Sequence, residues 1–377
     1  MRYFFVIRTQ SIGLYGEPFC FGYCIIDEIG IEYEKGYIEC DIEKAKGLES
    51  DYEWVCKNVV PMLPKMEEKM IVNDPDELCD ILWKIWIESR SKYKDIYCAA
   101  YCCYPVESGI FRRCVSKNIE EREEKAPYPF IEIATVQLLA GHDSLLSRDK
   151  KEEEKPIYNP IKDARYASNL LVEALEKIKN ISKNKMELIP TNNDIIFDNY
   201  SDFFGIDTKT VGLYGQVYDF GYVNINKTGN TEKGSFRSWC PIKNTDGLEK
   251  DKILRLKTLE NFPSALDRCN PNDILNDVWN LLLLLNNNNS LLISFCPYPV
   301  ETGLLQSCIS LDLENRQFMG PYPLHDTATA LFLCNLDPLS DFDRKPNELP
   351  RYNPINGARQ AARLFLECSK TIKSICT

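Results

Sequence analysis

The chain has 377 residues, 44% of them hydrophobic and 27% charged, a balance that is typical of globular domains and excludes a disordered chain. At this length two domains are expected rather than one. The net charge of −11 argues against a protein that coats duplex nucleic acid with a basic face, although the charge is uneven, at −9 over residues 1–200 and −2 over the remainder.

The first half of the chain is predicted to be mixed α/β. Strands are expected where apolar residues form short runs, at residues 3–7, 19–26 and 96–100. Helices are expected where a proline suits the first helical turn, after the Asp74-Pro75 cap, from Pro129 and from Pro160.

Blocks of the first half recur in the second half in the same order. RTQSIGLYGEPFCFGY at 8–23 matches DTKTVGLYGQVYDFGY at 207–222, and four further blocks match in turn. Five matching blocks indicate an internal duplication. We therefore expect domains at 1–185 and 200–377, joined by a polar linker at 186–199. The second domain should repeat the strands at 202–206, 218–225 and 291–295, and the helices from Asn270-Pro271, Pro323 and Pro354.

These blocks resemble the motifs of the bacterial and phage DEDDh 3′–5′ exoribonucleases. In that family DxExxGL lies on a first strand, CPWPVE follows a central strand, PYPLHE opens a helix and HNPxxDAR opens the last helix. The counterparts here include PYPVETG, PYPLHD and YNPINGAR in the second half, and the resemblance covers nearly all of both halves. It implies an α/β fold of two tandem ribonuclease H-like domains, each a mixed five-stranded sheet flanked by helices.

The resemblance also implies where the catalytic residues would lie. The family uses four carboxylates to hold two divalent metal ions and a His as general base. The matching positions are Arg8, Gln10, Tyr101, Tyr158 and Asp163 in the first domain, and Asp207, Lys209, Phe295, Tyr352 and Gly357 in the second. Each domain keeps one of the five catalytic residues, and Arg8 and Lys209 place a cation where a metal ion would sit. The sequence therefore predicts two inactive sites, with no catalytic residue, no metal and no cofactor.

Several side chains at these sites have two interpretations. Arg8 and Lys209 could bind phosphate, or could form ion pairs with the remaining acids. The four aromatic residues could stack on bases, or could fill the vacated cleft. Glu107 and Glu301, in the PVE blocks, could be leftover acids of the cleft, or structural groups. For each set the structural role is the preferred expectation, as it is for His325.

We therefore expect a catalytically inactive tandem exonuclease-like protein that acts as a structural scaffold or protein-binding module. A protein partner or self-assembly is preferred because the chain is acidic. The Asn-, Ile- and Lys-rich composition and the decayed phage-type nuclease point to a large DNA virus and a virion component. Two alternatives stay open: a non-cleaving binder of RNA or single-stranded nucleic acid in the old cleft, and a residual 3′–5′ exonuclease whose metals are held by other residues.

The 16 cysteines are expected to be reduced and mostly in the core, because no secretory signal accompanies them. No run approaches the roughly 20 apolar residues of a membrane span, so no membrane partner is expected. The expected location is intracellular, in the cytoplasm or in a virion.

Overall fold

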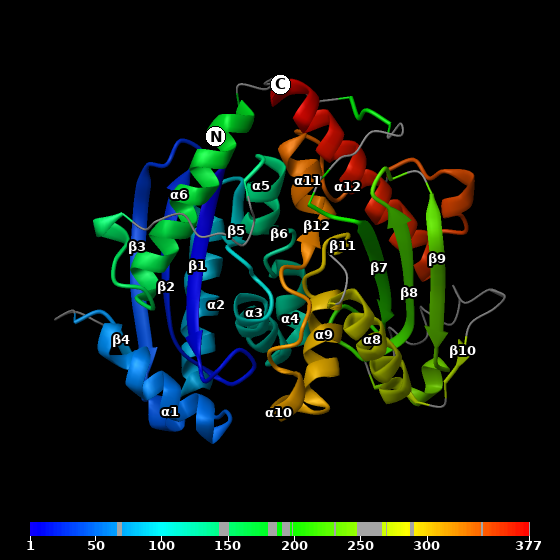
Figure 1. The fold of residues 1–377 in the computed structure, drawn as a ribbon. Helices are drawn as coiled ribbons and strands as arrows, with labels where there is room; N and C mark the ends of the chain where they lie inside the picture. The colour runs from blue at the N-terminus through cyan, green and yellow to red at the C-terminus, as the bar shows by residue number, and fades with distance from the viewer. Residues whose placement is uncertain are drawn as a thin grey trace. The chain divides into compact units, whose positions relative to one another are not determined.

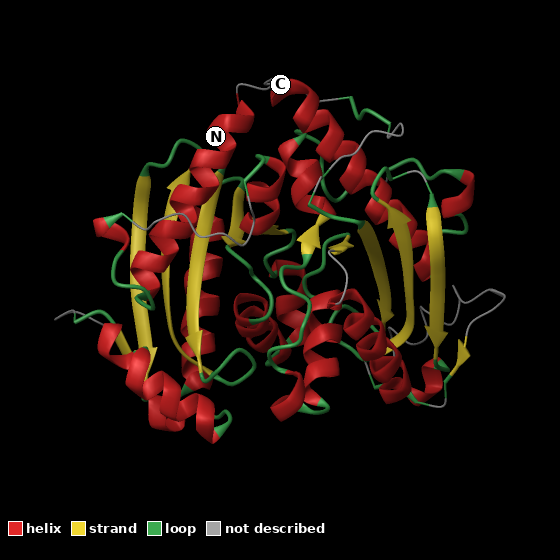
Figure 2. Cartoon of the chain, viewed as in Figure 1, coloured by secondary structure: helices red, strands yellow, loops and turns green. Residues whose placement is uncertain are grey.

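The computed structural model divides the chain into two compact units, Met1–Asn180 (unit 1) and Ile181–Thr377 (unit 2). It describes residues 1–65, 70–142, 151–179, 187–190, 197, 199–229, 231–246, 266–268, 270–286, 290–340 and 342–376. Each unit combines strands and helices (Figure 2). Within the described residues, no helix is both long enough and apolar enough to cross a membrane.

Unit 1 contains one mixed six-stranded sheet in the order β4-β3-β2-β1-β5-β6. The strands are β1 (Tyr3–Ser11), β2 (Pro18–Asp27), β3 (Glu32–Cys40), β4 (Met70–Val72), β5 (Ile96–Ala100) and β6 (Phe130–Glu132). β1, β2 and β3 pair antiparallel, whereas β4, β5 and β6 join the sheet in parallel. β2 is buried along its whole length, as expected of a strand covered on both faces.

Helices cover both faces of this sheet. They are α1 (Glu49–Asn58), α2 (Pro75–Lys92), α3 (Val106–Ser116), α4 (Ile119–Arg122), α5 (Ile133–Leu139) and α6 (Pro160–Lys179). α6 crosses β1 and β2 in front of the sheet, with α2 behind it (Figure 1). The start of α6 approaches β2 so closely that a Cβ on Gly22 would lie 2.5 Å from the carbonyl carbon of Pro160. A glycine at this position is therefore what brings the last helix onto the sheet.

Unit 2 repeats this arrangement, with the strand order β10-β9-β8-β7-β11-β12. Its strands are β7 (Asp202–Thr210), β8 (Val217–Asn226), β9 (Glu232–Trp239), β10 (Leu266–Asp267), β11 (Ser290–Ser294) and β12 (His325–Asp326). Its helices are α8 (Pro271–Asn286), α9 (Val300–Ser310), α10 (Leu313–Arg316), α11 (Thr327–Leu333) and α12 (Pro354–Cys376). Gly221 on β8 meets the start of α12, where its Cβ would lie 2.5 Å from Ile355 N.

Equivalent side-chain contacts also occur within each of the two units. Tyr15 and Tyr104 in unit 1 bring their hydroxyl oxygens within 3.0 Å, and the matching hydroxyls of Tyr214 and Tyr298 in unit 2 lie 3.2 Å apart. A guanidinium on the last helix forms a bidentate pair with the first glutamate of the third strand in both units, Arg165 with Glu32 and Arg359 with Glu232. The sequence repeat is therefore a repeat of contacts as well as of strand order.

The expected fold class is confirmed, with one correction to the sheets. Each unit is mixed α/β, with one mixed sheet flanked by helices, but the sheet has six strands instead of the expected five. The additional strands, β4 with 3 residues and β10 with 2, are too short to leave an alternating pattern in the sequence.

The expected starts of two helices are wrong. Helices were expected from Pro129 and Pro323, but a short strand comes first in each unit, and the helices begin at Ile133 and Thr327. The residue before each helix is a buried acid whose carboxylate accepts hydrogen bonds from the first helical N–H groups. The helices that were expected from Pro75, Pro160, Pro271 and Pro354 begin at those residues.

The expected linker at 186–199 lies largely outside the described residues, so its boundaries stay a prediction. The described part of it packs on unit 2, because Ile189 N donates to Thr371 Oγ1 at 2.9 Å and the Phe197 ring meets Phe203 edge-on at 6.0 Å. Among the described residues, 14 cysteines are free, and all of them except Cys56 are buried.

Candidate functional site

In unit 1 a guanidinium lies between β1, the loop that follows β5 and the start of α3. Arg8, on β1, donates from Nη1 to the backbone carbonyl of Tyr101 at 2.7 Å, and the same nitrogen lies 3.4 Å from Glu107 Oε1. The Arg8 guanidinium therefore already contacts two acceptors within unit 1. Gln10 lies two residues further along β1 and is partly exposed.

Glu107 is a buried carboxylate that ties α3 to β1. Its side chain is 2% exposed, and Oε1 accepts the backbone N–H of Thr9 at 3.1 Å. Burial raises the pKa of Glu107. Arg8 and the Thr9 N–H oppose that rise, whereas the nearby Asp163 carboxylate adds to it. The structure thus brings Arg8, Glu107 and Asp163 together, with Asp163 buried on α6.

The aromatic residues of unit 1 form two separate pairs. The half-buried Tyr101 ring lies edge-on to Tyr166 with centroids 6.4 Å apart, and burial raises the pKa of its hydroxyl. Tyr158, which has a positive φ of 66°, lies edge-on to Trp54 at 5.6 Å. Trp54 itself is 49% exposed, so this second pair borders solvent.

In unit 2 the cation lies two residues further along the matching strand, at the position of Gln10, and is paired with the neighbouring acid. Lys209 Nζ lies 2.5 Å from Asp207 Oδ2, and both side chains are 20% exposed. Residues i and i+2 of a strand face the same side, which allows this pair on β7. A Cβ on Gly357 would lie only 2.2 Å from Asp207 Oδ2. The Asp207 carboxylate therefore occupies the space in which a side chain at position 357 would begin.

Two acids lie beside this pair: Asp219, which the sequence analysis did not consider, and Glu301, for which it preferred a structural role. Asp219, the cross-strand partner of Lys209, is buried and forms a bidentate ion pair with Arg237 at 2.8 and 2.6 Å. Burial raises the pKa of Asp219 to about 6 although Arg237 opposes the rise. Burial, and then the Asp207 charge, raise the pKa of Glu301 to about 8, so this carboxyl group is mostly protonated at neutral pH.

Glu301 repeats the structural role of its counterpart in unit 1. Its Oε1 accepts the backbone N–H of Thr208 at 2.9 Å, which ties α9 to β7. Phe295 lies half-buried after β11. Tyr352, before α12, is 45% exposed, so it does not have the space-filling role that was expected of it.

A further buried acid in each unit fixes the loop that follows the central strand. Glu132 accepts the backbone N–H groups of Cys102, Cys103 and Ala134 at 2.8–2.9 Å, and burial raises its pKa to about 7. Asp326 plays the same part in unit 2, where it accepts from Cys296 N at 3.1 Å and has its pKa raised to about 6 by burial. The repeat itself, PYPFIE against PYPLHD, was the signal for these two acids.

The two histidines stand apart from the positions of the expected general base. His325 precedes Asp326 on β12 and is 1% exposed, and burial lowers its pKa to about 3. It does not cap the following helix, because Asp326 does so. His142 Nδ1 lies 2.7 Å from Gln137 Oε1, after α5.

The side chains at these positions do not fit the two divalent metal ions that the resemblance implies. Across the described residues, no group of three or more His, Cys, Asp or Glu side chains is arranged to hold a metal ion. At these positions each unit has a positively charged side chain, Arg8 in unit 1 and Lys209 in unit 2. No step through a metal ion is therefore derived for either unit.

No family model matches the chain, and no curated protein matches its sequence. Among solved structures, E. coli exonuclease I in complex with a dT13 oligonucleotide matches with 9% identity and a TM-score of 0.34, over 59% of this chain and 55% of that chain. The metal-free form of an E. coli exonuclease I–ssDNA complex matches with 12% identity and a TM-score of 0.34, over 97% of this chain and 80% of that chain. The first match thus spans about half the length of the exonuclease chain. At these identities and TM-scores the likeness assigns neither a family nor an activity to this chain.

Proposed function

We propose that the chain is a non-catalytic scaffold built from two degenerate copies of a DEDDh exonuclease domain, and that its partner is a protein. The main support for the proposal is that a positively charged side chain in each cleft is already paired. Arg8 contacts the Tyr101 carbonyl and Glu107, and Lys209 contacts Asp207. A guanidinium or an ammonium at these positions repels a divalent metal ion at short range.

The remaining acids support the same proposal. One carboxylate is retained at the family's positions in each unit, Asp163 in unit 1 and Asp207 in unit 2. The neighbouring Glu301 has its pKa raised to about 8, and a protonated carboxyl group is a poor metal ligand. Two-metal phosphodiester hydrolysis needs several ionised carboxylates around one cleft, and the described residues of neither unit provide such a group.

The preference for a protein partner rests on charge. The chain carries a net charge of −11, and the cations in both clefts are already paired within their own units. Phosphate binding by these two side chains would require those pairs to break. The virion role and the viral source stay predictions from the sequence.

The test is a calorimetric titration of the full chain with Mn²⁺, followed by incubation with a short RNA that carries a 3′ overhang. We expect no stoichiometric metal binding and no shortening of the RNA. Asp163→Ala and Asp207→Ala variants, purified in the same way, control for contaminating nuclease. Shortening by the unchanged chain that either variant abolishes would contradict the proposal and establish a nuclease.

One observation favours a second candidate function, a non-cleaving binder of single-stranded nucleic acid. Trp54 is 49% exposed and lies edge-on to Tyr158, and exposed aromatic rings can stack on bases. Fluorescence anisotropy of a labelled oligonucleotide at low salt separates the two functions. Micromolar binding that weakens with salt and is lost in Trp54→Ala would favour this candidate over the protein scaffold.

A further inference from the structure

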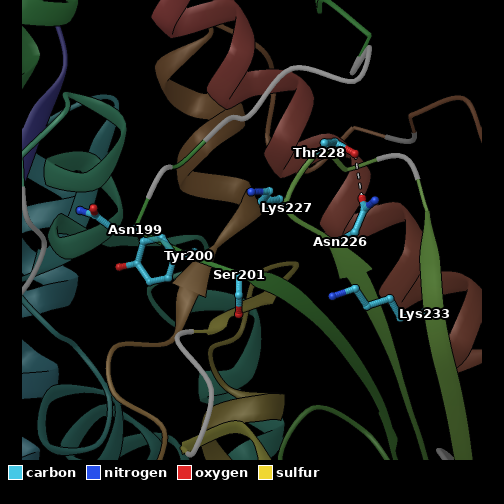
Figure 3. A pocket seen from close by; sticks show the side chains of 7 residues that line it. All are labelled: Asn199, Tyr200, Ser201, Asn226, Lys227, Thr228 and Lys233. Carbon is cyan, nitrogen blue, oxygen red and sulfur yellow. Dashed lines mark hydrogen bonds between the residues drawn. The ribbon is translucent and has the colours of Figure 1, made fainter.

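Unit 2 has a cavity of about 550 Å³ at the end of its sheet where β7 begins and β8 ends. It is lined by residues 199–201 before β7, residues 226–228 after β8, and Lys233 on β9 (Figure 3). A cavity of this volume is in the range of small-molecule sites. It lies five residues along β7 from Asp207, about 17 Å at the rise of a β-strand, so it is separate from the former nuclease cleft.

The cavity exists because unit 2 lacks rings that fill the same corner in unit 1. There Tyr3, Tyr33 and Tyr93 pack against one another with centroids 4.9–6.1 Å apart. The matching strand registers place Asp202 where unit 1 has Tyr3, and Lys233 where it has Tyr33. Two smaller charged side chains thus replace two aromatic rings, which leaves space and adds charge.

The charge around the cavity favours an anion. Lys233 forms an ion pair with Asp202, so one ammonium is balanced by one carboxylate. Lys227 is exposed, and within the described part of the chain it has no ion pair. In Figure 3 the ammonium ends of both lysines point toward the side on which Tyr200 and Ser201 lie. Among the described residues around the cavity, the second ammonium therefore leaves a net positive charge, whereas the whole chain is acidic.

The neutral groups of the cavity suit the rest of a small organic molecule. Ser201 and Thr228 add hydroxyl groups, of which Ser201 donates to Asp202 Oδ2 at 3.2 Å and Thr228 to Asn226 Oδ1 at 3.0 Å. The Tyr200 ring, fixed edge-on against Phe197 at 6.1 Å, adds an aromatic surface. The cavity is much larger than an inorganic phosphate ion, so a ligand that fills it carries an organic part.

We propose that this cavity binds a small organic phosphate monoester, with its phosphate on Lys227 and beside the Lys233 ammonium, which has three N–H donors and keeps its ion pair with Asp202. A phosphate monoester carries about −1.5 to −2 charges at pH 7, and lysine ammonium groups are common partners of such anions. The site is independent of the non-catalytic role of the two clefts, because it uses neither Arg8 nor Lys209.

The test is calorimetric titration of the full chain at low salt with adenosine 5′-monophosphate, ribose 5-phosphate, inorganic phosphate and adenosine. We expect at least one of the two esters to bind, tenfold or more tightly than inorganic phosphate, with no binding of adenosine. Binding of the first ester alone indicates a nucleotide, and binding of both indicates a sugar phosphate. Lys227→Gln should weaken binding about tenfold and the double variant with Lys233→Gln should abolish it, whereas the exposed Lys243→Gln should have no effect.

Three results would overturn the proposal. The first is the absence of saturable binding of either ester at millimolar concentration, and the second is equal affinity for inorganic phosphate and the esters. The third is binding that is unchanged both in Lys227→Gln and in the double variant. Because Lys227 is exposed and forms no ion pair with the described residues, its single variant keeps the fold and reports on binding alone.

Discussion

Replacing Glu301 by glutamine tests the electrostatics of the unit 2 cleft most directly. Glu301 is 3% exposed, accepts the Thr208 N–H at 2.9 Å and lies near the Asp207 carboxylate. Burial and the Asp207 charge raise its pKa from 4.5 to about 8. A glutamine has the same shape and can accept the same N–H with its carbonyl oxygen, but it has no proton to lose.

The size and sign of the effect follow from this pKa. Between pH 4.5 and about 8 the folded chain keeps the Glu301 proton, whereas the unfolded chain loses it. The free energy of unfolding therefore falls as pH rises through this window, by about 1.4 kcal/mol per pH unit. Between pH 5.5 and 7.5 this is about 3 kcal/mol, and glutamine removes that loss. We expect Glu301→Gln to stabilise unit 2 by about 2–3 kcal/mol more at pH 7.5 than at pH 5.5.

The measurement is urea unfolding at the two pH values, followed by tryptophan fluorescence, in which Trp239 and Trp279 report on unit 2. Both proteins contain every other ionisable group, so the difference between them reports on Glu301 and the acid that it interacts with. Glu314→Gln, on the exposed side of α10, is the matched control and should shift neither curve. If Glu301→Gln changes the free energy of unfolding equally at both pH values, or is less stable than the unchanged chain at pH 7.5, the reasoning is refuted. Glu301 would then be ionised in the folded chain.

Two further substitutions test the packing of the same cleft. Gly357→Ala places a Cβ 2.2 Å from Asp207 Oδ2 and should destabilise unit 2 by about 1–3 kcal/mol. Gly234→Ala, with nothing within 4 Å of its Cβ, should change thermal stability by less than about 1 kcal/mol. Arg237→Leu leaves the buried Asp219 without its ion pair and should cost about 3–5 kcal/mol in urea unfolding. Adding Asp219→Leu should recover part of that loss, and a double variant no more stable than the single one would contradict this account.

The elements that the sequence predicted are those with strong local signals. β1, β2 and β5 are short apolar runs, and α2 carries its own cap, since Asp74 accepts from the N–H groups of Asp76 and Glu77. β3 was missed because four of the nine residues of Glu32–Cys40 are charged and its first half is largely exposed. Such a strand is formed by pairing with its neighbour in the sheet, which no local pattern shows.

The sequence by itself determined the repeat of five blocks and the presence of the cations Arg8 and Lys209 within the first of these blocks, because both are properties of residue order and type. The tertiary structure alone decided what these cations contact. Arg8 reaches a carbonyl 93 residues away, and Gly357 opens the space that the Asp207 carboxylate takes. The raised pKa of Glu301 and the cavity around Lys233 likewise arise from burial and packing between segments distant in sequence. Charge and burial act through distance in space, and the fold sets that distance.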